Sequence, residues 1–294
     1  MCAGRVAVIS GAGRGLGRCH ALALAAAGAA VVVNDLGSGR DGNGQASPVA
    51  EEVVSEIRAL GGQAVASGHD VADWDASRRL VELAVGEFGR LDVVVNNAGI
   101  LRDRMLVNMS AEEWDAVMHV HLRGTFALSR WAASHWRERS KAGDEVDARI
   151  INTTSPSGLF GKPGQANYGA AKAGIATLTM IAAAELARYG VTVNAVAPVA
   201  YTRMTSDLVT DPRAVDELAP EHVSPVVTWL AGASSREVTG RVFEVSGRRL
   251  GVAEPWRHGP SVVPDGVMDP VEVGVTIERL LEQAAPPESM GGNL

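Results

Sequence analysis

The chain has 294 residues, of which 46% are hydrophobic and 21% are charged, and its formal net charge is −7 at pH 7. This composition is typical of a globular protein and excludes a disordered chain, and the lack of a regular glycine period excludes collagen. The acidic balance disfavours a general affinity for nucleic acid, and no apolar run approaches the roughly 18 residues of a membrane span. We therefore expect neither nucleic acid nor a membrane as a partner.

The cysteines and the first residues indicate the compartment. Cys2 and Cys19 are too few for a disulfide framework and lack the spacing of metal ligands, so no metal site is expected. The strand-like run Arg5–Ser10 begins soon after Met1, with no long apolar segment before it. We expect no secretory signal and a cytoplasmic protein.

Seven short runs rich in Val and Ile are predicted to be strands. They lack a strict alternation of polar and apolar residues, which is typical of strands buried on both faces of a parallel sheet. In chain order they are Val6–Ile9, Ala29–Asn34, Gln63–Ser67, Leu91–Val95, Arg149–Thr154, Val191–Val196 and Arg241–Val245.

Helices are predicted between these strands. They are Leu16–Gly28, Pro48–Leu60, Asp75–Phe88, Ala111–Glu138, Gln165–Tyr189 and His222–Leu230. The alternation of strands and helices predicts an α/β fold, with a single Rossmann-type, doubly wound parallel sheet of about seven strands and helices on both faces.

Two segments interrupt this alternation. Gly37–Ser47 is a glycine-rich insertion, which we interpret either as a surface loop or as the border of a nucleotide site. The proline-rich tail from residue 254 has one predicted helix, Val271–Gln283, and is too short for a core of its own. We expect residues 1–253 to form one domain and residues 254–294 to form an appendage that packs on the body or on a neighbouring subunit.

A glycine-rich loop, Ser10–Gly17, follows the first strand and opens the first helix. Glycine permits tight turns and a close approach of a pyrophosphate, whose negative charge is favoured at a helix N-terminus. Because it lies between a strand and a helix, the loop predicts a dinucleotide site. The residues assigned to this site are Gly11, Arg14, Gly15, Leu16 and Gly17.

Asp35 indicates which dinucleotide binds. It ends the second strand, about 20 residues beyond Gly15, where a carboxylate can accept both hydroxyls of the adenosine ribose. A 2′-phosphate at that position would meet a like charge. Arg14 argues in the opposite direction, because a guanidinium in the glycine loop can meet such a phosphate. We give more weight to Asp35 and predict NAD rather than NADP.

Two turns at the ends of strands extend the nucleotide site. Asp70 follows the third strand and is placed to accept a hydrogen bond from the adenine amino group. Asn96 follows the fourth strand and is expected to hold either the cofactor or the strand backbone. The cofactor-binding candidates in these turns are Asp70, Val71, Asn97, Ala98 and Gly99.

A Ser, a Tyr and a Lys form the candidate catalytic group. Tyr168 and Lys172 lie four residues apart on a predicted helix and therefore share one face. A lysine ammonium stabilises a phenolate over a phenol, which would lower the pKa of Tyr168. Ser155, at the end of the fifth strand, can donate a hydrogen bond to the oxygen of a carbonyl or alcohol substrate.

With the glycine loop, the Asn-Asn-Ala-Gly turn and this Ser-Tyr-Lys group in order, the chain resembles the short-chain dehydrogenase/reductase family over about residues 4–250. The resemblance implies a nicotinamide cofactor and hydride transfer, with Tyr168 as the general acid and base. It also implies that Tyr168 and Lys172 contact the cofactor, and that Lys172 binds the nicotinamide ribose. Pro198 and Thr202, after the sixth strand, are further candidate cofactor contacts.

Within this family, five segments are similar to the dehydrogenase part of peroxisomal multifunctional enzyme type 2, also called 17β-hydroxysteroid dehydrogenase. They are Val32–Gly37, the glycine-rich insertion, Val93–Arg104, His119–Gly124 and Gly164–Tyr168. This likeness implies an NAD-dependent enzyme that interconverts (3R)-3-hydroxyacyl-CoA and 3-oxoacyl-CoA. The alternatives are a steroid alcohol dehydrogenase, a 3-oxoacyl-carrier-protein reductase and, from another class, an NAD-binding sensor without turnover. The intact Ser-Tyr-Lys group argues against a sensor.

The chain departs from the family pattern at His121, where many members have Asn in the long central helix. We interpret this histidine either as a fourth catalytic residue or as a packed helix residue. Substrate recognition is expected from Thr202–Glu217, in the crevice beyond the carboxyl ends of the strands. The candidates for binding CoA phosphates are Arg102, Arg104, Arg203, Arg248 and Arg249. The alternative interpretation of each is a solvent-exposed arginine that binds no ligand.

Assembly is expected from two predicted helices, Ala111–Glu138 and Gln165–Tyr189. Both helices are long and have more apolar residues than the face packed against the sheet requires. The alanines of the second helix permit another helix to approach closely. The family resemblance implies that these helices pair across a two-fold axis. We therefore expect a homodimer or a homotetramer.

Overall fold

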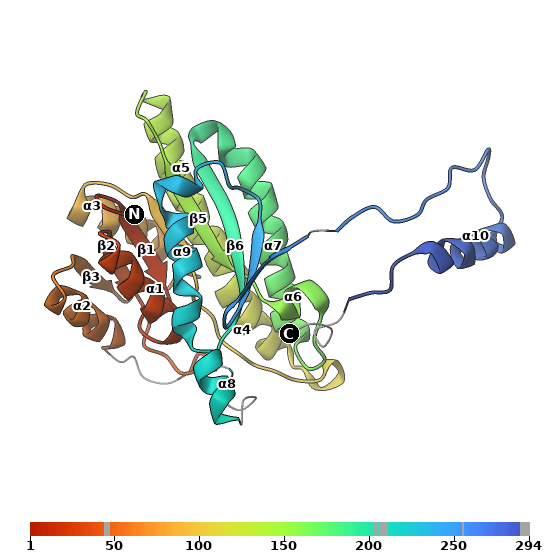
Figure 1. Cartoon of the computed structure of the whole chain (residues 1–294), viewed down its shortest axis with the longest axis horizontal. Coiled ribbons are helices and arrows are strands. Elements are labelled where there is room, and N and C mark those ends of the chain that lie inside the picture. The colour runs from red at the N-terminus through yellow and green to blue at the C-terminus, as the bar shows by residue number, and fades with distance from the viewer. Residues whose placement is uncertain (44–47, 203–204, 206–210, 255, 289–294) are drawn as a thin grey trace.

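Eight strands form a single sheet in this computed structural model, which describes residues 1–43, 48–202, 205, 211–254 and 256–288. The strand order is β3-β2-β1-β4-β5-β6-β7-β8. Figure 1 labels β1, β2, β3, β5 and β6 of this sheet. The strands are β1 Val6–Ser10, β2 Ala30–Asn34, β3 Ala64–Ser67, β4 Val93–Asn96, β5 Ala148–Thr153, β6 Val191–Val199, β7 Val242–Ser246 and β8 Arg249–Ala253.

The first seven strands are parallel, and only the pair β7–β8 is antiparallel. The strand order reverses direction between β1 and β4, because β2 and β3 extend the sheet on one side and β5 to β7 extend it on the other. Such a reversal opens a crevice at the carboxyl ends of the strands, where doubly wound sheets bind ligands. The predicted α/β fold is confirmed.

Sequence reasoning missed the eighth strand. β8 returns along β7 through a tight turn in which Ser246 pairs with Arg249. Gly247 in this turn has a φ of +53°, which residues with a side chain rarely adopt. The run that forms β8, Arg-Leu-Gly-Val-Ala, has little of the Val and Ile enrichment by which the other strands were recognised.

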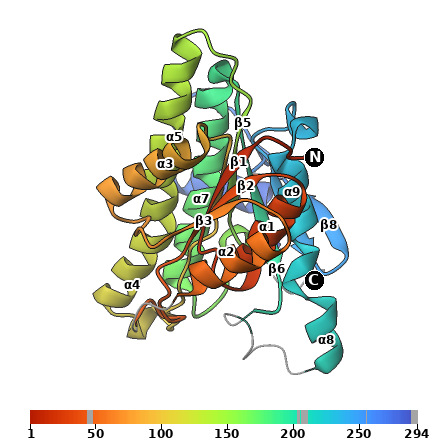
Figure 2. The same cartoon turned by 90° about the vertical axis from the view of Figure 1, so that its left-hand side faces the viewer.

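Helices cover both faces of the sheet, as Figure 2 shows. One face packs against α1, α2 and α9, and the other packs against α3, α5 and α7. The helices are α1 Gly15–Ala26, α2 Val49–Ala59, α3 Trp74–Phe88, α4 Ala111–Met118, α5 Gly124–Lys141, α6 Pro156–Phe160, α7 Ala166–Leu186, α8 Pro212–Glu217, α9 Ser224–Ala231 and α10 Pro270–Gln283. Short 3₁₀ turns cover Leu106–Asn108, Ala187–Tyr189, Pro220–His222 and Ala233–Ser235.

The long central helix predicted over Ala111–Glu138 forms without a gap but is not α-helical throughout. A π-helical turn, His119–Arg123, separates α4 from α5. A π turn has wider hydrogen-bond rings than an α-helix and is often found at functional sites. The apolar periodicity does not show this irregularity, so the sequence predicted one regular helix.

The C-terminal tail contains α10, whose described residues include no buried side chain. Figure 1 shows this helix held away from the sheet and its covering helices. The helix is well capped at its start, because the Asp269 carboxylate accepts hydrogen bonds from the backbone N–H groups of Val271 and Glu272. The expected packing on the body of the same chain is therefore not observed for α10.

One helical stretch among the described residues, Ala166–Tyr189, is long and apolar enough to cross a membrane. It packs along β6 and beside α6 in this fold. Core helices of globular folds meet the same criteria of length and composition, so this stretch is weak evidence for a span.

Trp136 is the largest side chain in the core, and its removal tests the packing of α5 on the sheet. It is 1% exposed, and its indole N–H donates to the carbonyl oxygen of Leu91 at 2.7 Å. We expect Trp136→Ala to lower the free energy of unfolding by about 3–5 kcal/mol in urea titrations. Trp256 is 97% exposed, so Trp256→Ala is the matched control and should leave stability unchanged. Equal losses in both variants would contradict this packing.

Candidate active site

The glycine loop after β1 has a backbone that only glycine can supply at two positions. Gly11 has a φ of +63°, and a Cβ at Gly17 would lie 2.1 Å from the carbonyl oxygen of Gly11. The loop therefore turns tightly before α1 begins. Arg14, at the N-cap position of α1, makes no side-chain cap to the first turn of this helix. The N–H groups of that turn are thus available to an anion.

A second loop, after β4, holds the glycine loop in place. The amide of Asn97 donates to the carbonyl oxygens of Ser10 at 3.1 Å and Gly11 at 3.0 Å. In return, the Ser10 hydroxyl oxygen accepts from the backbone N–H groups of Asn97 and Ala98, at 3.0 and 3.1 Å. A Cβ at Gly11 would lie 2.8 Å from the Cα of Ala98. Asn97, which sequence reasoning placed at the cofactor, thus binds the backbone of the glycine loop.

Asp35 lies beside this loop, at the end of β2. Its two carboxylate oxygens accept hydrogen bonds from the backbone N–H groups of Gly13 at 2.9 Å and Gly37 at 2.7 Å. Each carboxylate oxygen can still accept a further bond, so both ribose hydroxyls can be bound there. The Arg14 guanidinium donates to the carbonyl oxygen of Ser38 at 3.3 Å, in the glycine-rich insertion. The residues around the glycine loop therefore fit an adenosine dinucleotide.

The insertion, described as far as residue 43, packs against the chain that follows the β4 loop. The backbone N–H of Leu101 donates to the carbonyl oxygen of Arg40 at 3.0 Å. A Cβ at Gly42 would lie 3.2 Å from the side chain of Ile100. Of the two interpretations of the insertion, these contacts favour a border of the nucleotide site over a detached surface loop.

The turns after β3 and β4 are held within the protein. The Asp70 carboxylate accepts from the backbone N–H of Ala72 at 2.8 Å, and the neighbouring Val71 is buried. The Asn96 amide donates to the Ser129 hydroxyl and to the Asn152 side chain, both at 2.8 Å. The amide nitrogen of Asn96 thus binds side chains of β5 and α5, and the expected contact of Asn96 with the cofactor or the strand backbone stays a prediction.

Ser155, Tyr168 and Lys172 lie together at the carboxyl end of β5. Ser155 caps the short α6, where its hydroxyl oxygen accepts from the backbone N–H of Ser157 at 3.2 Å, and it lies close enough to Tyr168 to lower the pKa of that residue. The Lys172 ammonium donates to the carbonyl oxygen of Thr153 at 2.6 Å and lies 5.5 Å from the centre of the Tyr168 ring. The three predicted side chains therefore form one cluster.

Burial dominates the acid–base behaviour of this cluster. Burial raises the pKa of Tyr168 to about 12; the neighbouring Ser155 hydroxyl counteracts this rise, and the Asp103 carboxylate contributes to it. Burial also lowers the pKa of Lys172 to about 7. The sequence predicted a lowered pKa for Tyr168. The loss of hydration outweighs any stabilisation of the phenolate by Lys172 here.

His121 lies inside the π turn, against the loop that follows β4. Its Nε2 is 2.8 Å from the carbonyl oxygen and 3.0 Å from the backbone nitrogen of Ile100. Its ring meets the Tyr168 ring edge-on at 5.2 Å. A Cβ at Gly99 would lie 2.3 Å from the imidazole Cε1, so Gly99 makes room for this ring. Burial lowers the pKa of His121 to about 3, which keeps the ring neutral.

The substrate candidates are only partly brought together. Thr202 lies near the glycine loop, since a Cβ at Gly15 would be 3.7 Å from its side chain. Arg203, and residues 204 and 206–210 of the predicted substrate segment, lie outside the described residues. Arg104 pairs with Glu113 at 3.2 Å. Pro198, which was predicted to contact the cofactor, lies in β6, opposite Val245 of β7.

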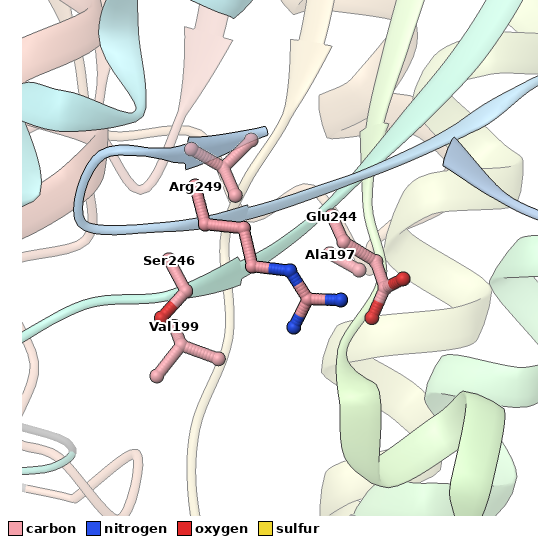
Figure 3. Close-up of a pocket in the computed structure, with 6 residues that line it drawn as sticks. Ala197, Val199, Glu244, Ser246 and Arg249 are labelled. Carbon is pink, nitrogen blue, oxygen red and sulfur yellow. The ribbon is translucent and has the colours of Figure 1, made fainter. Parts of the chain in front are cut away.

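Arg249 lies apart from the catalytic cluster, in a small pocket where β6, β7 and β8 meet. Figure 3 shows its guanidinium and the Glu244 carboxylate extending into the same hollow. The pocket is lined by Ala197, Val199, Glu244, Val245, Ser246 and Arg249. A carboxylate in this pocket opposes the binding of a phosphate at Arg249.

Comparisons with known proteins point to one family. Residues 5–213 match the family described as short chain dehydrogenase. The chain is 45% identical, over 97% of its length and 91% of the relative's, to hydroxyacyl-CoA dehydrogenase ChsB1 of Mycobacterium tuberculosis. It is 42% identical to peroxisomal multifunctional enzyme type 2 of Mus musculus, over 98% of this chain and 39% of the mouse protein. A crystal structure of a short chain dehydrogenase from Mycobacterium avium matches with a TM-score of 0.89 and 55% identity, over 98% of each chain.

The crowding at Gly17 predicts a specific loss of dinucleotide binding. In Gly17→Ala the new methyl group collides with the carbonyl oxygen of Gly11, so the loop must shift. We expect the Kd for NAD, measured by tryptophan fluorescence, to rise about tenfold or more, which corresponds to about 1.4 kcal/mol. Gly86 in α3 is the control, because a Cβ added there would meet no other atom within 4 Å, so Gly86→Ala should bind NAD normally. Unchanged binding by Gly17→Ala would contradict the role of this loop.

Proposed function

The chain belongs to the short-chain dehydrogenase family, and on that premise we propose that it is an NAD-dependent oxidoreductase that interconverts (3R)-3-hydroxyacyl-CoA and 3-oxoacyl-CoA. The observation that carries this proposal is the cluster of Ser155, Tyr168 and Lys172 beside the glycine loop. The substrate class is supported by the name of one relative, a hydroxyacyl-CoA dehydrogenase, and by the 42% identity to a peroxisomal multifunctional enzyme.

Tyr168 is the residue that we propose moves the proton. When bound, NAD supplies a hydride acceptor for the carbon that carries the substrate hydroxyl. The Tyr168 oxygen takes the hydroxyl proton during oxidation and returns it during reduction. Ser155, which lies beside Tyr168, orients the substrate oxygen. His121 stays neutral and buried against the Tyr168 ring, where it supports the position of this ring.

The cofactor is proposed to lie along the carboxyl ends of β1, β2 and β4. Asp35 binds the adenosine ribose, and Lys172 binds the nicotinamide ribose. The other proposed contacts are Gly11, Arg14, Gly15, Leu16, Gly17, Asp70, Val71, Asn97, Ala98, Gly99, Pro198 and Thr202. The carboxylate of Asp35, with its free acceptor capacity, supports NAD over NADP.

The chain is further proposed to act in the cytoplasm as a homodimer or homotetramer. Apolar side chains exposed on α5 and α7, among them Phe126 and Ile181, support pairing through these helices. Residues 1–253 form the proposed catalytic domain and residues 254–294 the appendage. Since α10 buries no side chain in its own chain, a neighbouring subunit is its proposed contact.

Tyr168→Phe tests the proton transfer. The variant keeps the ring that packs against His121 and removes only the hydroxyl. We expect kcat to fall by about 10²–10⁴-fold, the range typical of a positioned acid or base, while the Kd for NAD stays unchanged. The partly buried Tyr189 gives the control, since Tyr189→Phe should retain full activity. Wild-type turnover in Tyr168→Phe would disprove the assignment.

Asp35→Ser tests the cofactor preference. Loss of the carboxylate removes the acceptor for the ribose hydroxyls and the repulsion of a 2′-phosphate. We expect kcat/KM with NAD to fall and the ratio of NADP to NAD use to rise by about tenfold or more. A wild-type enzyme that already prefers NADP would overturn the argument from Asp35. It would indicate instead that the Arg14 guanidinium binds the 2′-phosphate.

A substrate panel tests the proposed activity. We expect the CoA thioester of a 3-hydroxy acid to be oxidised with a higher kcat/KM than the free acid, and the R isomer to be preferred over the S isomer. Added salt should lower kcat/KM for the CoA thioester, because it screens the attraction between CoA phosphates and nearby arginines. The kcat/KM for neutral steroid alcohols should not depend on salt in this way. If a steroid alcohol gives a higher kcat/KM than hydroxyacyl-CoA substrates of several chain lengths, the proposed function is wrong and steroid oxidation takes its place.

A further inference from the structure

Asn167 directly precedes the candidate catalytic Tyr168 and is completely buried. It is 0% exposed, and every hydrogen-bonding group of its side chain faces protein. The amide nitrogen donates to the carbonyl oxygens of Arg102 at 2.9 Å and Glu113 at 3.1 Å. The amide oxygen accepts from the backbone N–H of Tyr168 at 2.7 Å. One side chain thus joins the start of α7 to two other segments.

The bond to the Tyr168 backbone has a clear physical role. The first N–H groups of a helix have no partner within the helix, and polar side chains at the helix start satisfy them. Asn167 is the second residue of α7 and satisfies the N–H of the next residue from within the helix. Its own amide group is fixed by two backbone carbonyls. The start of α7 therefore cannot rotate or slide without breaking these bonds.

The carbonyl of Arg102 belongs to a segment that also contacts the glycine-rich insertion. The Arg102 guanidinium donates to the carbonyl oxygen of Asp41 at 3.0 Å and to the Asn43 side chain at 3.4 Å. Residues 101–104 therefore lie between the insertion, which borders the adenosine end of the nucleotide site, and the start of the helix that carries Tyr168.

Two further bonds strengthen the connection to α7. The side chain of Gln165, at the N-cap of α7, donates to the Asp103 carboxylate at 2.7 Å. The backbone N–H of Arg104 donates to the carbonyl oxygen of Gly164 at 2.9 Å. Asn167 is the most deeply buried member of this set, at 0% exposed against 7% for Gln165, and its side chain contacts the Tyr168 backbone directly.

We propose that Asn167 is a positioning residue for the reaction described under Proposed function, on which this inference rests. It fixes the Tyr168 side chain relative to Ser155 by tying the start of α7 to the backbone of Arg102, and through residues 101–104 to the insertion. The contacts of the glycine loop and of Asp35 do not involve Asn167. Its loss should therefore impair proton transfer and leave cofactor binding intact.

Asn194 provides a matched control at a distance from the site. It is 2% exposed and bridges two backbone segments in the same way: its amide donates to the carbonyl oxygen of Val238 at 2.7 Å and accepts from the backbone N–H of Arg241 at 3.1 Å. Asn167→Ala and Asn194→Ala each leave buried backbone groups unpaired, so both should lower the melting temperature. Asn167→Ser is a second, less disruptive variant, since serine keeps a small polar group at the helix start.

The experiment compares steady-state kinetics of the wild type and the three variants. We expect both Asn167 variants to lower kcat, by about tenfold or more in the alanine variant, because small displacements of reacting groups are costly. Their KM for NAD should stay within about threefold of the wild-type value, the scatter usual for uncoupled sites. Asn194→Ala should keep both constants. An unchanged kcat in Asn167→Ala, or equal losses in Asn167→Ala and Asn194→Ala, would overturn the proposal.

A readout without turnover separates this inference from the proposed function. The chain has 3 tyrosines, so the NMR signals of isotope-labelled tyrosine Cζ can be assigned with Tyr168→Phe. The Cζ of Tyr168 lies at the reacting end of the ring, and we expect its signal to shift in the Asn167 variants while those of Tyr189 and Tyr201 do not. A wild type that oxidises no hydroxyacyl-CoA would defeat the proposed function, and the Tyr168 signal would still decide the role of Asn167. An unshifted Tyr168 signal would overturn the proposed role of Asn167. Failure of both Asn167 variants to fold, while Asn194→Ala folds, would also overturn it.

Discussion

The site depends on a close contact between the two loops that leave the neighbouring strands β1 and β4. Ser10 and Asn97 exchange hydrogen bonds across this contact, and there is no room for a side chain at Gly11. The glycine loop therefore takes its shape from its neighbour as well as from its own sequence. The parallel sheet makes this possible, because it brings the carboxyl ends of successive strands to one edge.

From the β4 loop, contacts continue to the catalytic helix. Gly99 lies against the His121 ring, and this ring lies against Tyr168. A π turn rather than a regular helix carries His121, in a position where its Nε2 meets the backbone of Ile100. His121 Nδ1 is buried and has no hydrogen-bond partner among the described residues, which is costly unless a bound molecule supplies one. The π turn therefore carries His121 between the loop after β4 and the Tyr168 ring.

The sequence predicted the elements whose signal is local. Continuous Val and Ile runs located seven strands, and the glycine loop and the Ser-Tyr-Lys spacing located residues that the fold brings to one edge of the sheet. It did not predict β8 or the π turn, because neither changes the apolar pattern. The backbone contacts of Asn97 and Asn167 were also not predicted. Their roles consist of hydrogen bonds to backbone carbonyls of distant segments, and no spacing rule encodes such partners.

The central claim is that the Tyr168 oxygen accepts the substrate proton, and the pH dependence of oxidation tests it most directly. Burial raises the pKa of Tyr168 to about 12, so the phenolate fraction of the free enzyme grows about tenfold per pH unit well below that value. The account predicts that kcat/KM for oxidation rises steadily between about pH 7 and pH 9, where the phenol is still mostly protonated. A rate that is flat or falls over this range, in an enzyme that stays folded, would contradict it.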